Sequence, residues 1–215
     1  MNRFLYFAGF AWIALCGAVL MHAVSARQRP PAMMTVDTAV PVVPRAAPAT
    51  NGQQWFATMK PYCNPVEVDV RERYTPAPNT ADGAGYAAAC FALAGKIDRA
   101  KSIIESMPAG DRGAAANILF EVAHPVADAG DDRASGPMME LVLDYWPNNY
   151  MALYHAGMSE YSLGQTALAE SHLEAFLKMY NAADGFTGAA RAALAKIKEA
   201  GGARKDVERD PPARP

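Results

Sequence analysis

Histidine, cysteine and clustered glutamate side chains are where this sequence could do chemistry. None of the four histidines has a partner at the HxxxH or CxxC spacing that holds a metal ion; they are His22, His124, His155 and His172. The segment "GAGYAA" (83–88) lacks the preceding strand of a dinucleotide site, and no GxSxG nucleophile motif occurs. Glu160, Glu170 and Glu174 fall in amphipathic patterns, where carboxylates usually face water. We therefore expect no catalytic residue, metal, cofactor or small-molecule substrate, and a protein that is not an enzyme.

The cysteines favour a structural bond over catalysis. Cys16 lies in an apolar segment, so Cys63 and Cys90 are the only cysteines outside it. Such a pair in an exported domain favours a disulfide. The alternative is two separate buried thiols, because free cysteine behaves as a small apolar residue. A Cys63–Cys90 disulfide would also favour an extracytoplasmic location.

The N-terminal segment 1–26 is predicted to be a transmembrane anchor or a signal peptide. Residues 4–24 are almost wholly apolar and long enough to span a bilayer, whereas "VSA" (24–26) offers a cleavage site. We favour a retained anchor because the apolar run exceeds the usual length of a signal peptide core. Arg3 on one side and Arg27 and Arg29 on the other leave the orientation unsettled by charge.

The segments on either side of the predicted helical domain have the composition of a linker and a tail. Residues 27–52 contain five prolines, which favour an extended spacer; a strand-like docking role for "TVDTAVPVVP" (35–44) is the alternative. Residues 201–215 are charged and proline-containing, and we expect them to be disordered. The net charge of −2 and the lack of a basic stripe argue against nucleic-acid binding.

A glycine recurs between two helical patterns. Gly95, Gly130 and Gly164 each follow an apolar, alanine-rich segment and precede an amphipathic one. Their spacing of about 34 residues is typical of a repeat protein built from helical hairpins. We expect Gly130 and Gly164 to adopt a backbone conformation that side chains resist, or to lie at tight helix contacts.

This pattern resembles the tetratricopeptide (TPR) repeat over residues 81–183. The matching positions are Ala88, Phe91, Gly95, Ala100, Ile104 and Met107, then Ala123, Gly130, Met139, Val142 and Pro147, then Ala156, Gly157, Gly164, Ala169, Leu173 and Phe176. The resemblance implies an all-α, TPR-like αα-hairpin solenoid of about three repeats within residues 81–200. It also implies a partner-binding groove lined by the first helix of successive repeats, here Asn117, Phe120, His124, Asp128, Met151, Tyr154, Met158 and Tyr161.

Two further helical segments are expected to flank the repeats. Residues 53–80 are interpreted as a degenerate helical hairpin, although Val66, Val68 and Val70 alternate like a strand. Asn64 followed by Pro65 favours a helix start instead. Residues 186–200 predict a solitary capping helix with one apolar face, ended by Gly201 and Gly202.

We therefore expect a non-catalytic, membrane-anchored TPR-like protein that binds another protein on the extracytoplasmic side. Its location would be the bacterial inner membrane, single-pass, with the C-terminal domain in the periplasm, or the periplasm itself after signal cleavage. The alternative is a constitutive subunit of a large inner-membrane complex (energy-converting, photosynthetic or envelope). Small residues in the apolar segment would allow close helix packing in such a complex: Ala8, Gly9, Ala11, Ala14, Gly17 and Ala18.

Overall fold

The computed structural model describes residues 51–209. Every regular element in this range is helical, so the all-α expectation is confirmed there. The predicted anchor, nearly all of the linker and the last six residues of the predicted tail lie outside the described residues.

Within residues 51–209 no helix is both long and apolar enough to cross a membrane.

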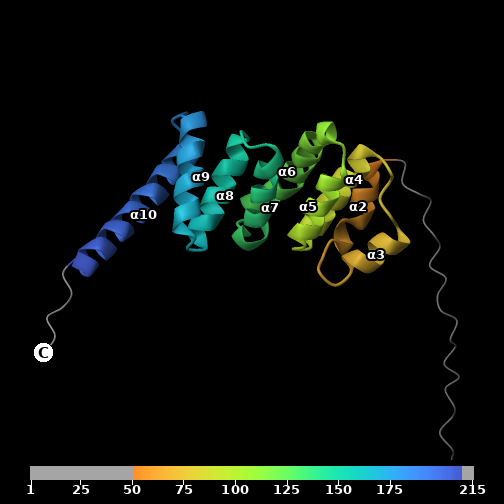
Figure 1. Cartoon of the computed structure of the whole chain (residues 1–215), viewed down its shortest axis with the longest axis horizontal. Helices are drawn as coiled ribbons and strands as arrows, with labels where there is room; N and C mark the ends of the chain where they lie inside the picture. Colours follow the sequence, from red (N-terminus) through yellow and green to blue (C-terminus); the bar gives the residue numbers. More distant parts are fainter. Residues whose placement is uncertain (1–50, 210–215) are drawn as a thin grey trace, which may run out of the picture. The chain divides into compact units, whose positions relative to one another are not determined.

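Three helical hairpins follow one another along the chain, each packed on the next (Figure 1). The first joins α4 (Ala81–Leu93) to α5 (Ile97–Ser106). The second joins α6 (Arg112–Asp128) to α7 (Asp132–Tyr145), and the third joins α8 (Tyr150–Ser162) to α9 (Thr166–Met179). A short 3-10 helix, η2 (Ala109–Asp111), leads into α6. This serial, solenoid-like packing agrees with the repeat period of the sequence.

The turn glycines end the first helix of each hairpin. Gly95, Gly130 and Gly164 have φ values of 71°, 78° and 78°, a region that residues with a side chain rarely adopt. The residue after each glycine donates its N–H back to the helix; for Gly164 the bond runs from Gln165 N to Glu160 O at 2.8 Å. This is the Schellman arrangement. A Cβ at these glycines would meet no other described residue within 4 Å, so conformation and not close packing requires glycine.

The segment before the hairpins is helical, as interpreted. It contains α2 (Gly52–Met59), the 3-10 helix η1 (Lys60–Tyr62) and α3 (Val68–Tyr74). Before α3, the side-chain oxygen of Asn64 accepts hydrogen bonds from the N–H groups of Val66 and Glu67, both at 3.1 Å, which favours a helix start over a strand. Trp55 is 1 % exposed, and its indole N–H donates to Thr75 O at 2.8 Å.

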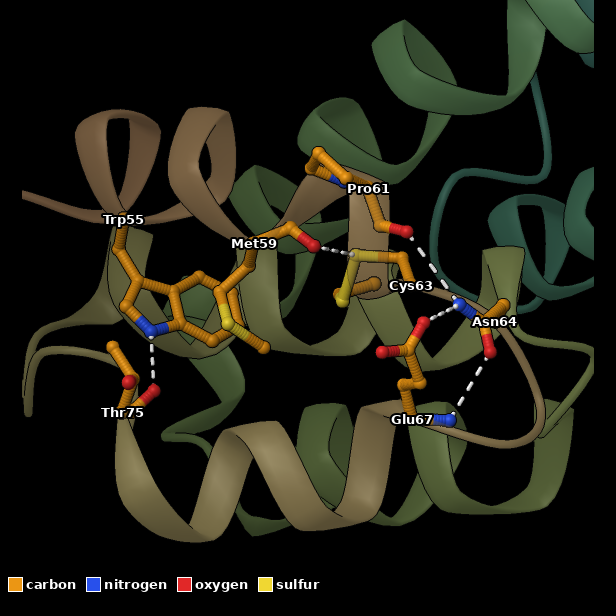
Figure 2. The surroundings of a disulfide bond; sticks show 8 residues. Trp55, Met59, Pro61, Cys63, Asn64, Glu67 and Thr75 are labelled. Atoms are coloured by element: carbon orange, nitrogen blue, oxygen red, sulfur yellow. Dashed lines mark hydrogen bonds between the residues drawn. A yellow bond between two sulfur atoms is a disulfide. The ribbon is translucent and has the colours of Figure 1, made fainter. Parts of the chain in front are cut away.

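A disulfide joins this segment to the first hairpin. Cys63 follows η1 and Cys90 lies in α4; their sulfur atoms are 2.01 Å apart and their Cα atoms 4.9 Å apart. Figure 2 shows the bond beside Trp55 and Met59, whose side chains belong to the same core. Both cysteines are buried. The bond therefore fastens the least regular part of the described chain to a well-formed helix pair.

The final helix packs against the last hairpin but extends further than expected. In α10 (Gly185–Arg209), Ala190, Ala193 and Leu194 join Leu173 and Phe176 of α9 in a core cluster. The sequence predicts that the helix ends at Gly201 and Gly202 and that residues 201–215 are disordered, but in the structure the helix continues to Arg209. A glycine costs only about 1 kcal/mol in a helix interior, and the residues that follow, "ARK", favour a helix.

Candidate functional site

Two histidines and an aspartate from neighbouring hairpins meet between α6 and α8. His124 and Asp128 lie one turn apart on α6, and His155 reaches them from α8. The Nε2 atoms of both histidines are 3.7 Å from the same carboxylate oxygen, Oδ1 of Asp128. One ligating atom from each of the three residues lies within 4.8 Å of the others. Three groups that can bind a metal ion or share a proton thus converge on one point.

His155 is the buried member of this cluster. It is 7 % exposed, and its Nε2 has no hydrogen-bond partner within the described part of the chain. Burial, followed by the charge of the neighbouring His124, lowers the pKa of His155 from 6.5 to about 4, against the opposing pull of Asp128 and Asp132. At neutral pH His155 is therefore uncharged, and it keeps one ring nitrogen able to accept a proton or a metal ion.

Aromatic rings hold both imidazoles in place. Phe120 stacks on His124 with ring centroids 5.0 Å apart, and Trp146 meets Phe120 edge-on at 6.2 Å. Tyr154 meets His155 edge-on at 5.2 Å, and the two histidine rings are 4.9 Å apart. These contacts form a continuous row of rings from α6 to α8, which restricts the rotation of each imidazole.

The predicted groove residues divide into two groups. All eight remain half-buried or exposed: Asn117, Phe120, His124, Asp128, Met151, Tyr154, Met158 and Tyr161. However, Tyr154, Met158 and Tyr161 pack against the core cluster that includes α10, and Phe186 of α10 meets the Tyr154 ring at 5.1 Å. Part of the partner-binding groove that the TPR resemblance implied on α8 is therefore involved in core packing instead.

Sequence reasoning missed His155 as a member of the site. Ligand spacings such as HxxxH join residues of one helix, whereas this cluster is assembled from two helices. The repeat period contained the missing signal, because His155 stands 31 residues after His124, close to one repeat of about 34 residues. The first helices of adjacent repeats, α6 and α8, lie side by side. Residues at nearly equivalent positions on them, such as His124 and His155, are therefore neighbours.

A second polar cluster lies between α7, α8 and α9. Glu160 is 1 % exposed, so the interpretation that it faces water is wrong. Its two carboxylate oxygens lie 2.8 and 2.9 Å from Nδ1 of His172, a hydrogen bond that raises the pKa of His172. Burial, followed by the Glu160 charge, raises the pKa of Glu140. These residues line a cavity of 290 Å³ with Leu143, Asp144 and Leu168. The positive charge of protonated His172 offsets the cost of burying the Glu160 carboxylate.

No protein-family model, curated protein or solved structure matches this chain.

Proposed function

We propose that this chain is a non-catalytic, membrane-anchored TPR-like protein that binds another protein through the face formed by α6 and α8. The observation that carries the proposal is the row of rings from Phe120 to Tyr154, which are half-buried except for the buried His155, flanked by the exposed polar residues Asn117 and Asp128. Aromatic side chains with a polar rim are typical of protein-binding surfaces. The half-buried Met151 adds an adaptable side chain on the same helix as Tyr154.

The repeated architecture supports the TPR-like part of the proposal. Each hairpin turns on a glycine with positive φ, and the hairpins recur with the period of the sequence. The small residues of the resemblance also lie at helix contacts. A Cβ on Gly157 would come within 2.7 Å of Leu173 Cγ, so the close approach of α8 and α9 depends on glycine there.

The disulfide and the apolar N-terminal sequence support the proposed location. A Cys63–Cys90 bond persists in an oxidising compartment such as the periplasm and is uncommon in the cytosol. Residues 4–24 have the length and composition of a membrane anchor. Together they favour a domain held at the outer face of a bacterial inner membrane.

Site-specific photocrosslinking in native membranes tests the proposed surface. A photoreactive phenylalanine analogue at Phe120 should crosslink to a discrete partner protein. The matched control places the same analogue at Tyr74, which is exposed on α3 and far along the chain from the ring row. Replacing Phe120 with alanine should release the same partner in a pull-down. Equal crosslinking from both positions, or undiminished recovery with Phe120→Ala, would count against this surface.

The same pull-down distinguishes this proposal from the alternative, in which the chain is a constitutive subunit of an inner-membrane complex. In that case the small residues of segment 4–24 would supply the binding energy through helix packing. Replacing residues 4–24 with an unrelated transmembrane sequence should then release the complex, while Phe120→Ala leaves it intact. The leading proposal expects the opposite pattern.

A further inference from the structure

We propose that His124, Asp128 and His155 bind one divalent transition-metal ion of the zinc class. This inference goes beyond the proposed protein-binding role and does not depend on it. It rests on the separation of the three ligating groups, on the burial of His155 and on the chemical character of the ligand set.

The separations match ligands of one metal ion better than they match hydrogen bonds. Oδ1 of Asp128 lies 3.7 Å from Nε2 of His124 and 3.7 Å from Nε2 of His155. A hydrogen bond between these atoms would be shorter. Two ligands of one tetrahedral zinc ion stand about 3.3 Å apart, because each lies about 2.0–2.1 Å from the metal. Small rotations of exposed side chains would close the remaining gap, since Asp128 is 59 % exposed.

The unpartnered nitrogen of His155 is the second, independent observation. A polar group that is buried without a partner costs free energy, and no group among residues 51–209 satisfies Nε2 of His155. The same Nε2 atom lies 3.7 Å from Oδ1 of Asp128, so it faces the other ligating groups of the cluster. Phe120 and Tyr154 pack against the two imidazoles. The protein therefore holds two nitrogen ligands in a preset orientation, and a metal ion would satisfy the buried one.

The ligand set selects the type of ion. Two imidazoles and one carboxylate suit zinc, copper or nickel, whereas magnesium and calcium prefer oxygen ligands alone. Three protein ligands leave at least one coordination position open. Because Asp128 faces solvent, water would take that position, or a side chain of another molecule would replace it.

Zinc titration of the full-length chain in detergent tests the site. Isothermal calorimetry with Zn²⁺ should give one site per chain in the wild type. Asp128→Asn and His124→Gln should each weaken that site by at least ~10-fold. The matched control is Glu121→Gln, which removes one exposed carboxylate from the same helix outside the cluster and should bind zinc as the wild type does. Circular dichroism should give the same helical signal for all four proteins.

Copper electron paramagnetic resonance adds a structural readout. With Cu²⁺ as the probe, hyperfine coupling should come from two imidazole nitrogens in the wild type and from one in His124→Gln. Cys16 and His22 are present in every protein tested, so differences between variants report on the cluster alone. The absence of a saturable zinc site in the wild type would overturn the proposal. Equal weakening by Asp128→Asn and Glu121→Gln would do the same.

Discussion

The two carboxylate oxygens of Glu160 on α8 lie 2.8 and 2.9 Å from Nδ1 of His172 on α9. This pair links the two helices of the third hairpin across the turn at Gly164. Glu160 is almost fully buried and His172 half-buried, so the pairing offsets the cost of removing a charged carboxylate from water.

The pH dependence of stability should reflect this pair. Hydrogen bonding to Glu160, helped by the negative charges of Glu160 and Glu140, raises the pKa of His172 above its ordinary value of 6.5. A raised pKa means that charged His172 stabilises the fold below about pH 6.5, and that this contribution is lost as pH rises through the folded-state pKa. Urea unfolding should therefore give a lower free energy of unfolding at about pH 9 than at about pH 6.

The variant His172→Gln separates this effect from neighbouring groups. Glu140 and Asp144 face the same cavity, and the raised pKa of Glu140 also makes stability fall as pH rises. The loss between about pH 6 and about pH 9 should shrink in His172→Gln, and the variant should lose about 1–3 kcal/mol at the lower pH. Nuclear magnetic resonance titration should place the His172 pKa lower in Glu160→Gln. An unchanged pKa in that variant would exclude the pairing as its cause.

Substitution of Gly164 should cost stability through backbone conformation alone. Its φ is 78°, and a Cβ there would meet no atom of residues 51–209 within 4 Å. Gly164→Val should therefore lower the free energy of unfolding by about 1–3 kcal/mol, while Gly164→Asn should cost less, because asparagine tolerates positive φ. Gly157 is the contrasting position: there the cost is steric, and Gly157→Asn should be worse than Gly157→Ala. Equal urea midpoints for Gly164→Val and Gly164→Asn would contradict the conformational explanation.

Loss of the Cys63–Cys90 disulfide should destabilise the described domain. The two residues are separated by 27 positions, and closing a loop of that size contributes about 3 kcal/mol in the chain-entropy model. Unfolding with and without reductant measures this difference, with Cys63→Ser as the reductant-insensitive reference.

Non-reducing peptide mapping of protein alkylated on lysis of native membranes should recover a linked peptide pair. Recovery of both thiols in alkylated form would favour a cytoplasmic domain.

The packing of α10 on the third hairpin should depend on its apolar face. Ala190 is buried against the cluster that contains Leu173 and Phe176, so Ala190→Asp would place a charge there without a partner. We expect a loss of about 2 kcal/mol or more, with faster hydrogen exchange in α9 and α10 and little change in α4. Ala192→Asp, on the exposed side of α10, is the matched control. Similar exchange in the two variants would mean that α10 does not protect the hairpin.

The sequence by itself determined the features that depend on local chemistry and period. The three turn glycines could be recognised because positive φ at the end of a helix strongly favours glycine, and their spacing revealed the repeated hairpins. Asn64 and Pro65 indicated a helix start because they act on neighbouring backbone groups. For Cys63 and Cys90 the sequence favoured a disulfide, because only these two cysteines lie outside the apolar segment, but it left two separate buried thiols as the alternative.

Tertiary structure decided the features that depend on which helix faces which. Glu160 looked like a solvated residue, but α9 covers it and brings His172 to it. Tyr154 looked like an open groove residue, but α10 packs beside it. His155 had no partner within its own helix and meets Asp128 only because α6 and α8 lie side by side. A local sequence pattern indicates which face of its own helix a residue occupies. Which other side chain it contacts depends on how segments distant in the sequence pack together.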